Sequence, residues 1–261
     1  MVELFFRELG GAGQPPLVIL HGLLGSSRNW QTAGTDLATE AEVCALDLRN
    51  HGRSPHAAPM SYAAMVADVL GWMDRRGWTQ ADVMGHSMGG KTAMLLAARH
   101  PERVRRLVIV DIAPKVYLSY AHRAEFAAMH ELRLDVLQSR AEAELRFEAR
   151  VPDWAMRKFL ATNLERDANG GWRWSINLPE ITAALPDLEA NPLGPGEGFA
   201  GPTLFVTGGK SRYVAPEDHA EIRRRFPAVQ IVTIPESGHN PHMETRREFV
   251  GHVSAFLRAT H

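Results

Sequence analysis

GHSMGG, at residues 85–90, is the most informative part of this 261-residue sequence. The apolar run at residues 81–84 predicts a buried strand before it, and residues 91–99, rich in Ala and Leu, predict a helix after it. A strand, G-x-S-x-G and a helix in this order are typical of a nucleophile elbow, whose tight turn lifts the serine hydroxyl out at the carboxyl edge of a sheet. The pattern predicts that Ser87 is a catalytic nucleophile. The alternative is a glycine-rich turn with a passive serine.

The composition indicates a globular protein that does not bind nucleic acid. Hydrophobic residues make up 45% and charged residues 23% of the chain, whose length suits one large domain or a domain with an insertion. The formal net charge of −1 implies no basic patch. Cys44 is the only cysteine, which excludes an internal disulfide and fits a reducing compartment. The first residues do not resemble a signal peptide, and no apolar run approaches the ~18 residues of a membrane span, so we expect a cytoplasmic protein without one.

Apolar runs and helical patterns alternate near both ends of the chain. Strands are predicted over residues 2–9 at a sheet edge, 17–20, 43–48, 104–111, 203–207 and 229–234. Helices are predicted over residues 29–37, 62–76, 216–226 and 244–257. Strands that alternate with helices predict an α/β protein with a mostly parallel central sheet and helices on both faces.

The pattern changes over residues 115–200. Strand alternation disappears there, and helices are predicted over residues 121–132, 140–150 and 153–164. Trp172 and Trp174 are expected in a glycine-containing turn, and the prolines at 179, 186, 192 and 195 predict a return loop. We expect a core of residues 1–114 and 201–261, with residues 115–200 inserted as a helical cap. An independent module is the less favoured alternative, since both ends of the insertion meet the same edge of the alternating pattern.

A serine nucleophile needs a base to take its proton and an acid to orient that base. In hydrolase-type sheets the chain order is nucleophile, acid, histidine. His239 lies just after the last predicted strand, where a loop can bring its imidazole over the elbow, and Gly238 eases the path. We therefore predict that His239 is the general base, with an ordinary surface histidine as the alternative.

Two backbone amides are expected to form an oxyanion hole. One belongs to Met88, at the start of a helix whose dipole favours negative charge. The other belongs to Leu23, in the loop after the early strand at residues 17–20. The alternative is that Gly22 only permits a tight turn, and His21 is expected to bond the backbone rather than to transfer protons.

Four motifs together resemble the α/β-hydrolase superfamily: HGLLG at 21–25, DLRNHGRS at 47–54, GHSMGG at 85–90 and GH at 238–239. More narrowly, RNHG at 49–52, GGK at 89–91 and VDIAP at 110–114 are similar to YbfF-type bacterial serine esterases and their mitochondrial abhydrolase relatives. The resemblance implies an α/β-hydrolase fold over nearly the whole core. It also implies hydrolysis of carboxylic esters and thioesters with no cofactor and no metal.

The acid departs from the superfamily's commonest pattern. In that pattern an aspartate lies in the loop after the strand at 203–207, where this chain has Ser211. Asp111 ends the strand next to the elbow, from which a carboxylate can also reach His239, and the YbfF-type esterases resemble this arrangement. We predict Asp111 as the acid, with Ser211 free to hydrogen-bond to the acid or the histidine. Asp111 as a mere turn cap, or Asp218 or Glu217 as the acid, are the alternatives.

Other notable residues are expected to be structural. The loop at 49–54 is one such case, with Asp47 and Arg49 tying strand to loop, and Lys91 and Thr92 are expected only to begin the helix after Ser87. Several large apolar side chains of the cap, with Trp30, are divided between packing and the lining of a pocket: Phe126, Met129, Phe147, Trp154, Phe159, Trp172 and Trp174.

The sequence thus predicts a serine hydrolase that cleaves carboxylic esters or thioesters of small to medium acyl groups. One alternative keeps the same three residues for perhydrolysis of the cofactor-free haloperoxidase kind, or for hydrolysis of a carbon–carbon bond. Another is a non-enzymatic ligand-binding protein with the same fold. We expect a small-molecule ester or thioester as the partner, and the oligomeric state stays open between monomer and homodimer.

Overall fold

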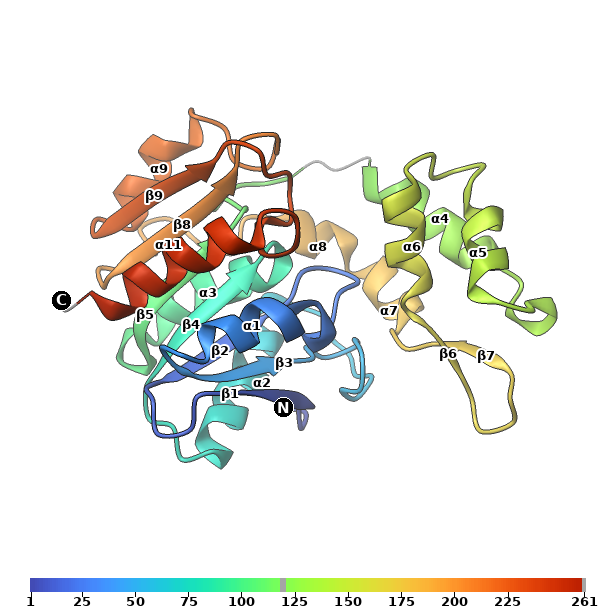
Figure 1. Ribbon diagram of the computed structural model, residues 1–261, viewed down its shortest axis with the longest axis horizontal. Coiled ribbons are helices and arrows are strands. Elements are labelled where there is room, and N and C mark those ends of the chain that lie inside the picture. Colours follow the sequence, from blue (N-terminus) through green and yellow to red (C-terminus); the bar gives the residue numbers. More distant parts are fainter. Residues whose placement is uncertain (118–120, 260–261) are drawn as a thin grey trace.

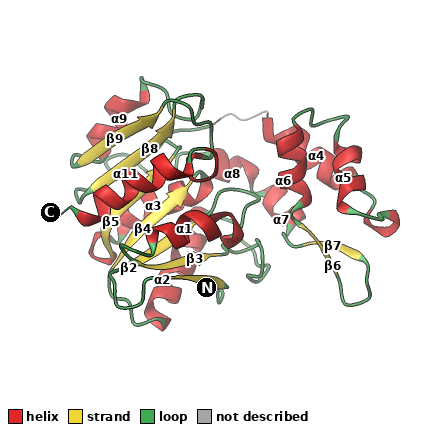
Figure 2. Cartoon of the chain, in the orientation of Figure 1, coloured by secondary structure: helices red, strands yellow, loops and turns green. Residues whose placement is uncertain are grey.

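The centre of the protein is a seven-stranded sheet, seen here in a computed structural model that describes residues 1–117 and 121–259. Figure 2 shows its strands in yellow, in the order β1-β3-β2-β4-β5-β8-β9. β1 runs antiparallel to β3, and every other neighbouring pair is parallel, so the predicted α/β class is confirmed. The strands are β1 (Phe6–Gly10), β2 (Pro16–Leu20), β3 (Glu42–Leu46), β4 (Ala81–His86), β5 (Val104–Val110), β8 (Thr203–Gly208) and β9 (Val229–Ile234).

Helices cover both faces of this sheet (Figure 1). Successive residues of β2 alternate between the two faces: Leu17 and Ile19 pack in the apolar cluster under α1 (Gln31–Leu37) and α11 (Arg246–Arg258). Val18 and Leu20 pack in the opposite cluster. Because both faces are buried, the parallel strands are continuous apolar runs in the sequence. The helices of the second face are α2 (Tyr62–Arg75), α3 (Met88–Arg99) and α9 (Asp218–Arg225).

The segment between β5 and β8 adds no described strand to the main sheet. It holds α4 (Ala121–Glu131), α5 (Arg140–Phe147), α6 (Trp154–Ala161), α7 (Leu178–Ala183) and α8 (Leu185–Glu189), with a hairpin of β6 (Leu164–Arg166) and β7 (Trp172–Trp174). In Figure 1 its green-to-yellow ribbon lies beside the sheet, with α8 nearest to it. We call this segment the insertion.

Two expectations for the insertion are wrong. Trp172 and Trp174 lie in β7, where Trp174 pairs with Leu164, rather than in a turn. Pro179 and Pro186 lie in the first turns of α7 and α8 rather than in a return loop. Proline is favoured in the first turn of a helix, because the N–H that it lacks has no partner there. A proline-rich segment can therefore hide short helices from a prediction that treats proline only as a breaker.

Boundaries elsewhere moved by a few residues. The helix expected over 29–37 begins as a 3-10 turn (Ser27–Trp30) before α1. The helix expected over 244–257 is divided at Thr245 into α10 (Pro241–Glu244) and α11. None of the helices in the described parts of the chain is long and apolar enough to cross a membrane.

Candidate active site

Ser87 occupies a strained turn between β4 and α3. Its φ of 51° lies in the left-handed region that non-glycine residues avoid, and its N–H donates to the Val110 carbonyl of β5 at 3.1 Å. Glycine is needed on both sides, since a Cβ at Gly85 would collide with the Gly89 carbonyl and one at Gly89 with that of Leu20. This is the geometry of the elbow that the sequence pattern predicts.

His239 and Asp111 meet beside this turn. His239, in the loop after β9, has Nδ1 at 2.7 Å from Asp111 Oδ2. Asp111 is fully buried at the end of β5, and its other oxygen accepts the N–H of Gly208 at 2.9 Å. The Ser211 hydroxyl donates to Oδ2. Three donors therefore fix the carboxylate, one from the end of β8, one from the loop that follows β8 and one from the loop after β9, and the carboxylate fixes the imidazole.

Two further contacts hold His239, one on its ring and one on its backbone carbonyl, and no sequence pattern marks either of them. The Tyr213 ring stacks on it, with centroids 3.7 Å apart and planes at 13°. His86 donates its Nε2–H to the His239 carbonyl at 2.8 Å. Burial, together with the nearby His239, holds the pKa of His86 well below its usual range, so His86 stays neutral.

Ser87 and His239 line one cavity of about 450 Å³. Within the described residues, no hydrogen bond joins Ser87 Oγ to the imidazole, although both residues line this cavity. Phe159 of α6 and Trp30 belong to its apolar lining. A smaller apolar cavity of about 50 Å³ adjoins Ser87 and is also lined by Leu23, Met88, Ile112, Leu185 and Leu188.

The two predicted oxyanion donors flank Ser87. Leu23 and Met88 both line the small cavity with the serine. The Leu23 amide has no hydrogen-bond acceptor among the described residues, and Met88 is the first residue of α3, where no intrahelical acceptor exists. A Cβ at Gly22 would lie 2.7 Å from His86 Nδ1, so this position needs glycine. Both N–H groups are therefore available to a carbonyl oxygen placed at Ser87.

Two buried histidines support the loop that carries Leu23. His21 Nε2 accepts the N–H of Leu48 at 3.0 Å, and its Nδ1–H donates to Gly22 at 2.8 Å. His51 Nε2 accepts the N–H of Leu24 at 3.2 Å, while its Nδ1–H donates to the Arg49 carbonyl at 2.9 Å. Burial lowers the pKa of His51 to about 3 and also lowers that of His21. Both are neutral supports, and the expectation that His21 bonds the backbone is confirmed.

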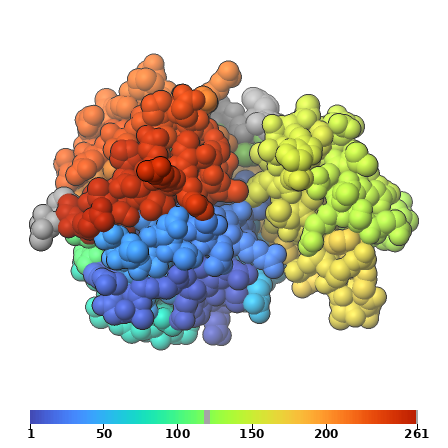
Figure 3. Space-filling model, in the orientation of Figure 1, coloured from blue at the N-terminus to red at the C-terminus, as the bar shows by residue number. Residues whose placement is uncertain are grey.

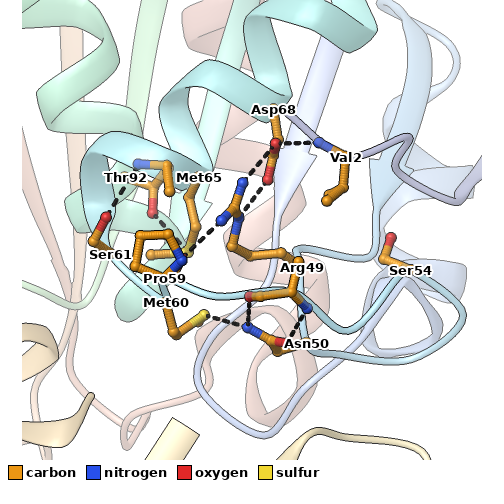
Figure 4. A network of polar contacts seen from close by, with 12 residues as sticks. Val2, Arg49, Asn50, Ser54, Pro59, Met60, Ser61, Met65, Asp68 and Thr92 are labelled. Atoms are coloured by element: carbon orange, nitrogen blue, oxygen red, sulfur yellow. Dashed lines mark hydrogen bonds and ion pairs between the residues drawn. The ribbon is translucent and has the colours of Figure 1, made fainter. Parts of the chain in front are cut away.

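The neighbouring loop is anchored by a buried ion pair, shown in Figure 4. The Arg49 guanidinium donates to the Asp68 carboxylate of α2 at 2.6 and 2.8 Å and to the Pro59 carbonyl at 2.7 Å. Asp68 also accepts the Val2 N–H at 2.7 Å. Asp47 ties strand to loop as expected, through the N–H groups of Ser27 and Arg53, whereas Arg49 bonds a helix instead.

Lys91 does more than begin α3. Its buried ammonium donates to three carbonyls at the end of α8, those of Leu188 at 3.2 Å, Glu189 at 3.0 Å and Ala190 at 2.7 Å. Burial lowers the pKa of Lys91 to about 7. The helix that carries Ser87 at its start is thereby joined to the insertion, a contact between distant segments that sequence spacing does not reveal.

The remaining candidates divide as follows. Asp218 pairs with Lys115 at 2.6 Å, away from His239. Phe126, Met129 and Phe147 are buried in the packing of the insertion, and Trp154 is 58% exposed. Phe159 and Trp30 are therefore the named apolar side chains that line the cavity at Ser87.

Residues 15–245 match the protein family described as alpha/beta hydrolase fold. The chain is 40% identical over 255 residues to the sn-1-specific diacylglycerol lipase ABHD11 of Mus musculus, which covers 95% of this chain and 82% of the lipase. It is 32% identical over 229 residues to Esterase YbfF of Escherichia coli (strain K12), covering 88% of this chain and 87% of the esterase. Among solved structures, a marine microorganism esterase matches with a TM-score of 0.94 at 35% identity, over 98% of this chain and 100% of that one. The expected resemblance to YbfF-type esterases is confirmed.

Proposed function

The chain belongs to the α/β-hydrolase fold family and is a hydrolase of the esterase and lipase kind. From this premise we propose that it cleaves carboxylic esters or thioesters of small to medium acyl groups. The reaction passes through an acyl-enzyme on Ser87. One observation carries the proposal. The Asp111 carboxylate lies 2.7 Å from His239 Nδ1, beside a serine in a strained turn that lines the same cavity.

In the first half of the reaction, Ser87 Oγ attacks the acyl carbonyl while His239 Nε2 takes the hydroxyl proton. Asp111 stabilises the imidazolium that forms. The N–H groups of Leu23 and Met88 bind the oxygen that becomes negative. When the tetrahedral intermediate collapses, Nε2 gives its proton to the leaving alcohol or thiol, and the acyl group remains on Ser87.

In the second half, water attacks the acyl-enzyme. His239 Nε2 takes a proton from the water, and the same two amides hold the oxyanion again. Collapse of this intermediate returns the proton to Ser87 Oγ and releases the carboxylic acid. The bond broken in the substrate is the acyl C–O or C–S bond, and no redox partner is needed.

The division of the chain supports this chemistry. We assign residues 1–114 and 201–261 to a catalytic core and residues 115–200 to a cap. Phe159 of α6 lines the cavity at Ser87, and Leu185 and Leu188 of α8 line the smaller apolar cavity, so the insertion supplies apolar surface on both sides of the serine. Such surface favours acyl chains over peptide substrates, which need polar anchors.

Ser87→Ala tests the proposal. Turnover of p-nitrophenyl butyrate should fall by about 10³-fold or more, because the nucleophile is lost, while thermal unfolding stays that of the wild type. A fluorophosphonate should label the wild type and not the variant. Ser254→Ala, on α11 and outside both cavities, is the matched control and should keep both readouts. Ester turnover that persists in Ser87→Ala would refute the mechanism, and an unlabelled wild type would favour a non-enzymatic binding protein.

A further inference from the structure

A second cavity, of about 510 Å³, borders the one at Ser87. It lies between the 3-10 turn Ser27–Trp30 and α10 of the core and the start of α5 with β6 of the insertion. Its wall is shared with the Ser87 cavity through Leu24, Gly25, Asn29, His242 and Met243. In Figure 3 the blue N-terminal surface meets the yellow surface of the insertion along this boundary. The two cavities therefore adjoin along these five residues.

This second cavity is rich in positive charge, and we call it the arginine cleft. Its lining includes five arginines and two acidic residues: Arg7, Arg28, Arg53, Arg140 and Arg246, with Asp47 and Glu165. The whole chain has a formal net charge of −1, so the excess is local. A local excess of one sign attracts ligands of the opposite sign.

Four of these guanidinium groups lack a carboxylate ion-pair partner within the described residues. Arg246 pairs with Asp36 at 3.3 Å and is the exception. The two acids of the lining have other partners. Glu165 pairs with Arg173 at 2.6 Å, and Asp47 is buried and accepts backbone N–H groups. The Asp47 carboxylate offsets one of the four unpaired positive charges, so the arginine cleft keeps a net positive charge.

The leaving group is the part of the substrate that faces this cleft. His239 gives its proton to the leaving atom, so the leaving group lies on the side of His239. His242 and Met243 follow in α10 and line both cavities. The acyl chain extends away from the arginine cleft, toward the small apolar cavity at Leu23 and Met88.

Resting on the hydrolase function above, we propose that the arginine cleft binds a phosphate group carried by the leaving alcohol or thiol of the substrate. The planar guanidinium fork matches the oxygens of a phosphate in a bidentate way, and several arginines suit a group that carries up to two negative charges. Such a phosphate has two sources, a soluble phosphorylated thiol or alcohol and the headgroup of a phospholipid.

Two substrate pairs test the proposal; all four compounds are butyryl esters or thioesters, and one member of each pair carries phosphate on the leaving side. Butyryl-CoA and butyryl-N-acetylcysteamine represent the soluble source, and dibutyryl phosphatidic acid and dibutyrylglycerol represent the lipid source. The readout is the ratio of kcat/KM for the phosphorylated member to that for the neutral member. We expect this ratio to exceed about 10 in one of the pairs at low salt and to fall as salt screens the charges. The pair that shows it identifies the source.

The arginine variant Arg28→Gln/Arg53→Gln should lower that ratio about tenfold, mainly through the KM of the phosphorylated member, because two exposed guanidinium contacts are each worth a few-fold. Arg223→Gln, at an exposed position on α9 without an ion-pair partner among the described residues, is the charge-matched control and should keep the wild-type ratio. Ratios near 1 in both pairs, or an equal loss in the control, would overturn the phosphate site.

Failure of the proposed function has a different signature. If the wild type hydrolyses neither member of either pair and no fluorophosphonate label appears, the hydrolase function itself fails. Calorimetry with CoA and with dibutyryl phosphatidic acid then tests the arginine cleft in Ser87→Ala. Binding of either ligand that weakens about tenfold when Arg28→Gln/Arg53→Gln is added supports the phosphate site, and absence of binding of both ligands refutes it.

Discussion

Two sides of Ser87 use the same side chain, imidazole, in opposite ways. On the acid–base side, His239 contacts a carboxylate, and 25% of its side chain is exposed to the cavity and solvent. On the oxyanion side, His21 and His51 are fully buried, and both ring nitrogens of each bond to the backbone. A histidine with an ionised partner and a free edge can carry a proton, whereas a histidine saturated by backbone groups can only hold a loop in place.

The comparison teaches that the partner, and not the residue type, separates a base from a support. The chain contains 12 histidines. His86 and His242 are also buried, and burial lowers the pKa of both, to about 3 for His242. Compared with His21, His51, His86 and His242, it is His239 that contacts a carboxylate.

Asp111→Asn should lower kcat for p-nitrophenyl butyrate by about 10³- to 10⁴-fold, because an amide neither stabilises the imidazolium nor fixes the tautomer that accepts the serine proton. The protein should remain folded, since Asn keeps an acceptor for the Gly208 N–H. Turnover and thermal unfolding of the purified variant measure both. Activity near the wild-type level would mean that another residue is the acid. His239 would then not depend on its contact with the Asp111 carboxylate.

Two companions make that experiment sharper. Asp218→Asn removes the alternative acid, which pairs with Lys115, and should change kcat by less than about threefold. Adding Ser211→Asp to Asp111→Asn moves a carboxylate to the superfamily's commonest position. Partial recovery of kcat, about tenfold, would show that a carboxylate from either loop can orient His239.

The fold and the polar contacts differed in how far the sequence could predict them. The parallel strands are continuous apolar runs because both sheet faces are covered, so periodicity and turn residues are enough to find them. The insertion has no such rule: Pro179 and Pro186 lie in the first turns of helices, and Trp174 pairs in a hairpin, through contacts that only the folded chain decides.

The site itself shows the same limit. Ser87 and His239 could be predicted from local motifs. The contact between Asp111 and His239 could be predicted because Asp111 ends the strand next to the elbow. Three other contacts join segments that lie far apart in the chain. Tyr213 stacks on the His239 ring, His86 donates to the His239 carbonyl, and Lys91 donates to carbonyls at the end of α8. No motif marks these contacts, because each depends on how two distant segments approach one another in the folded chain.

The oxyanion side predicts a loss of stability in acid. His51 has its pKa lowered to about 3 by burial, against about 6.5 in the unfolded chain. Below pH 6.5 the unfolded state binds a proton that the folded state does not, so stability present above that pH is lost as the pH falls toward 3. Between pH 6.5 and 5 this amounts to about 2 kcal/mol for His51 alone. The free energy of unfolding in urea at both pH values measures it.

His51→Gln removes that titration. The variant is expected to be less stable at pH 7, because a bond to the Leu24 N–H is disturbed, but to lose about 2 kcal/mol less than the wild type between pH 6.5 and 5. The lowered pKa values of His21, His86 and His242 contribute equally to both proteins. His252→Gln on α11, where 39% of the side chain is exposed, controls for the loss of an imidazole as such. Equal pH dependence in wild type and His51→Gln would mean that His51 is protonated in the folded protein and is no neutral support.

The smallest expected effect concerns Ser211, which joins the parts of the acid–base side to one another. Its hydroxyl donates to Asp111 Oδ2 and accepts the N–H of Tyr213 at 3.1 Å. Tyr213 is the residue whose ring stacks on His239. Ser211→Ala removes both bonds but leaves the Gly208 N–H and His239 on Asp111, so kcat should fall by only about three- to tenfold.

Ser211→Thr restores the hydroxyl and should recover most of that loss, which separates a positioning role from a simple effect of side-chain size. The expected order of kcat is therefore wild type, Ser211→Thr, Ser211→Ala and, far below, Asp111→Asn. If Ser211→Ala were as damaging as Asp111→Asn, the hydroxyl would carry the orientation of His239 and the carboxylate contact would not suffice. The distinction between the two sides of Ser87 would then rest on a network of neutral groups, as it does around His21 and His51, and not on one ionised partner.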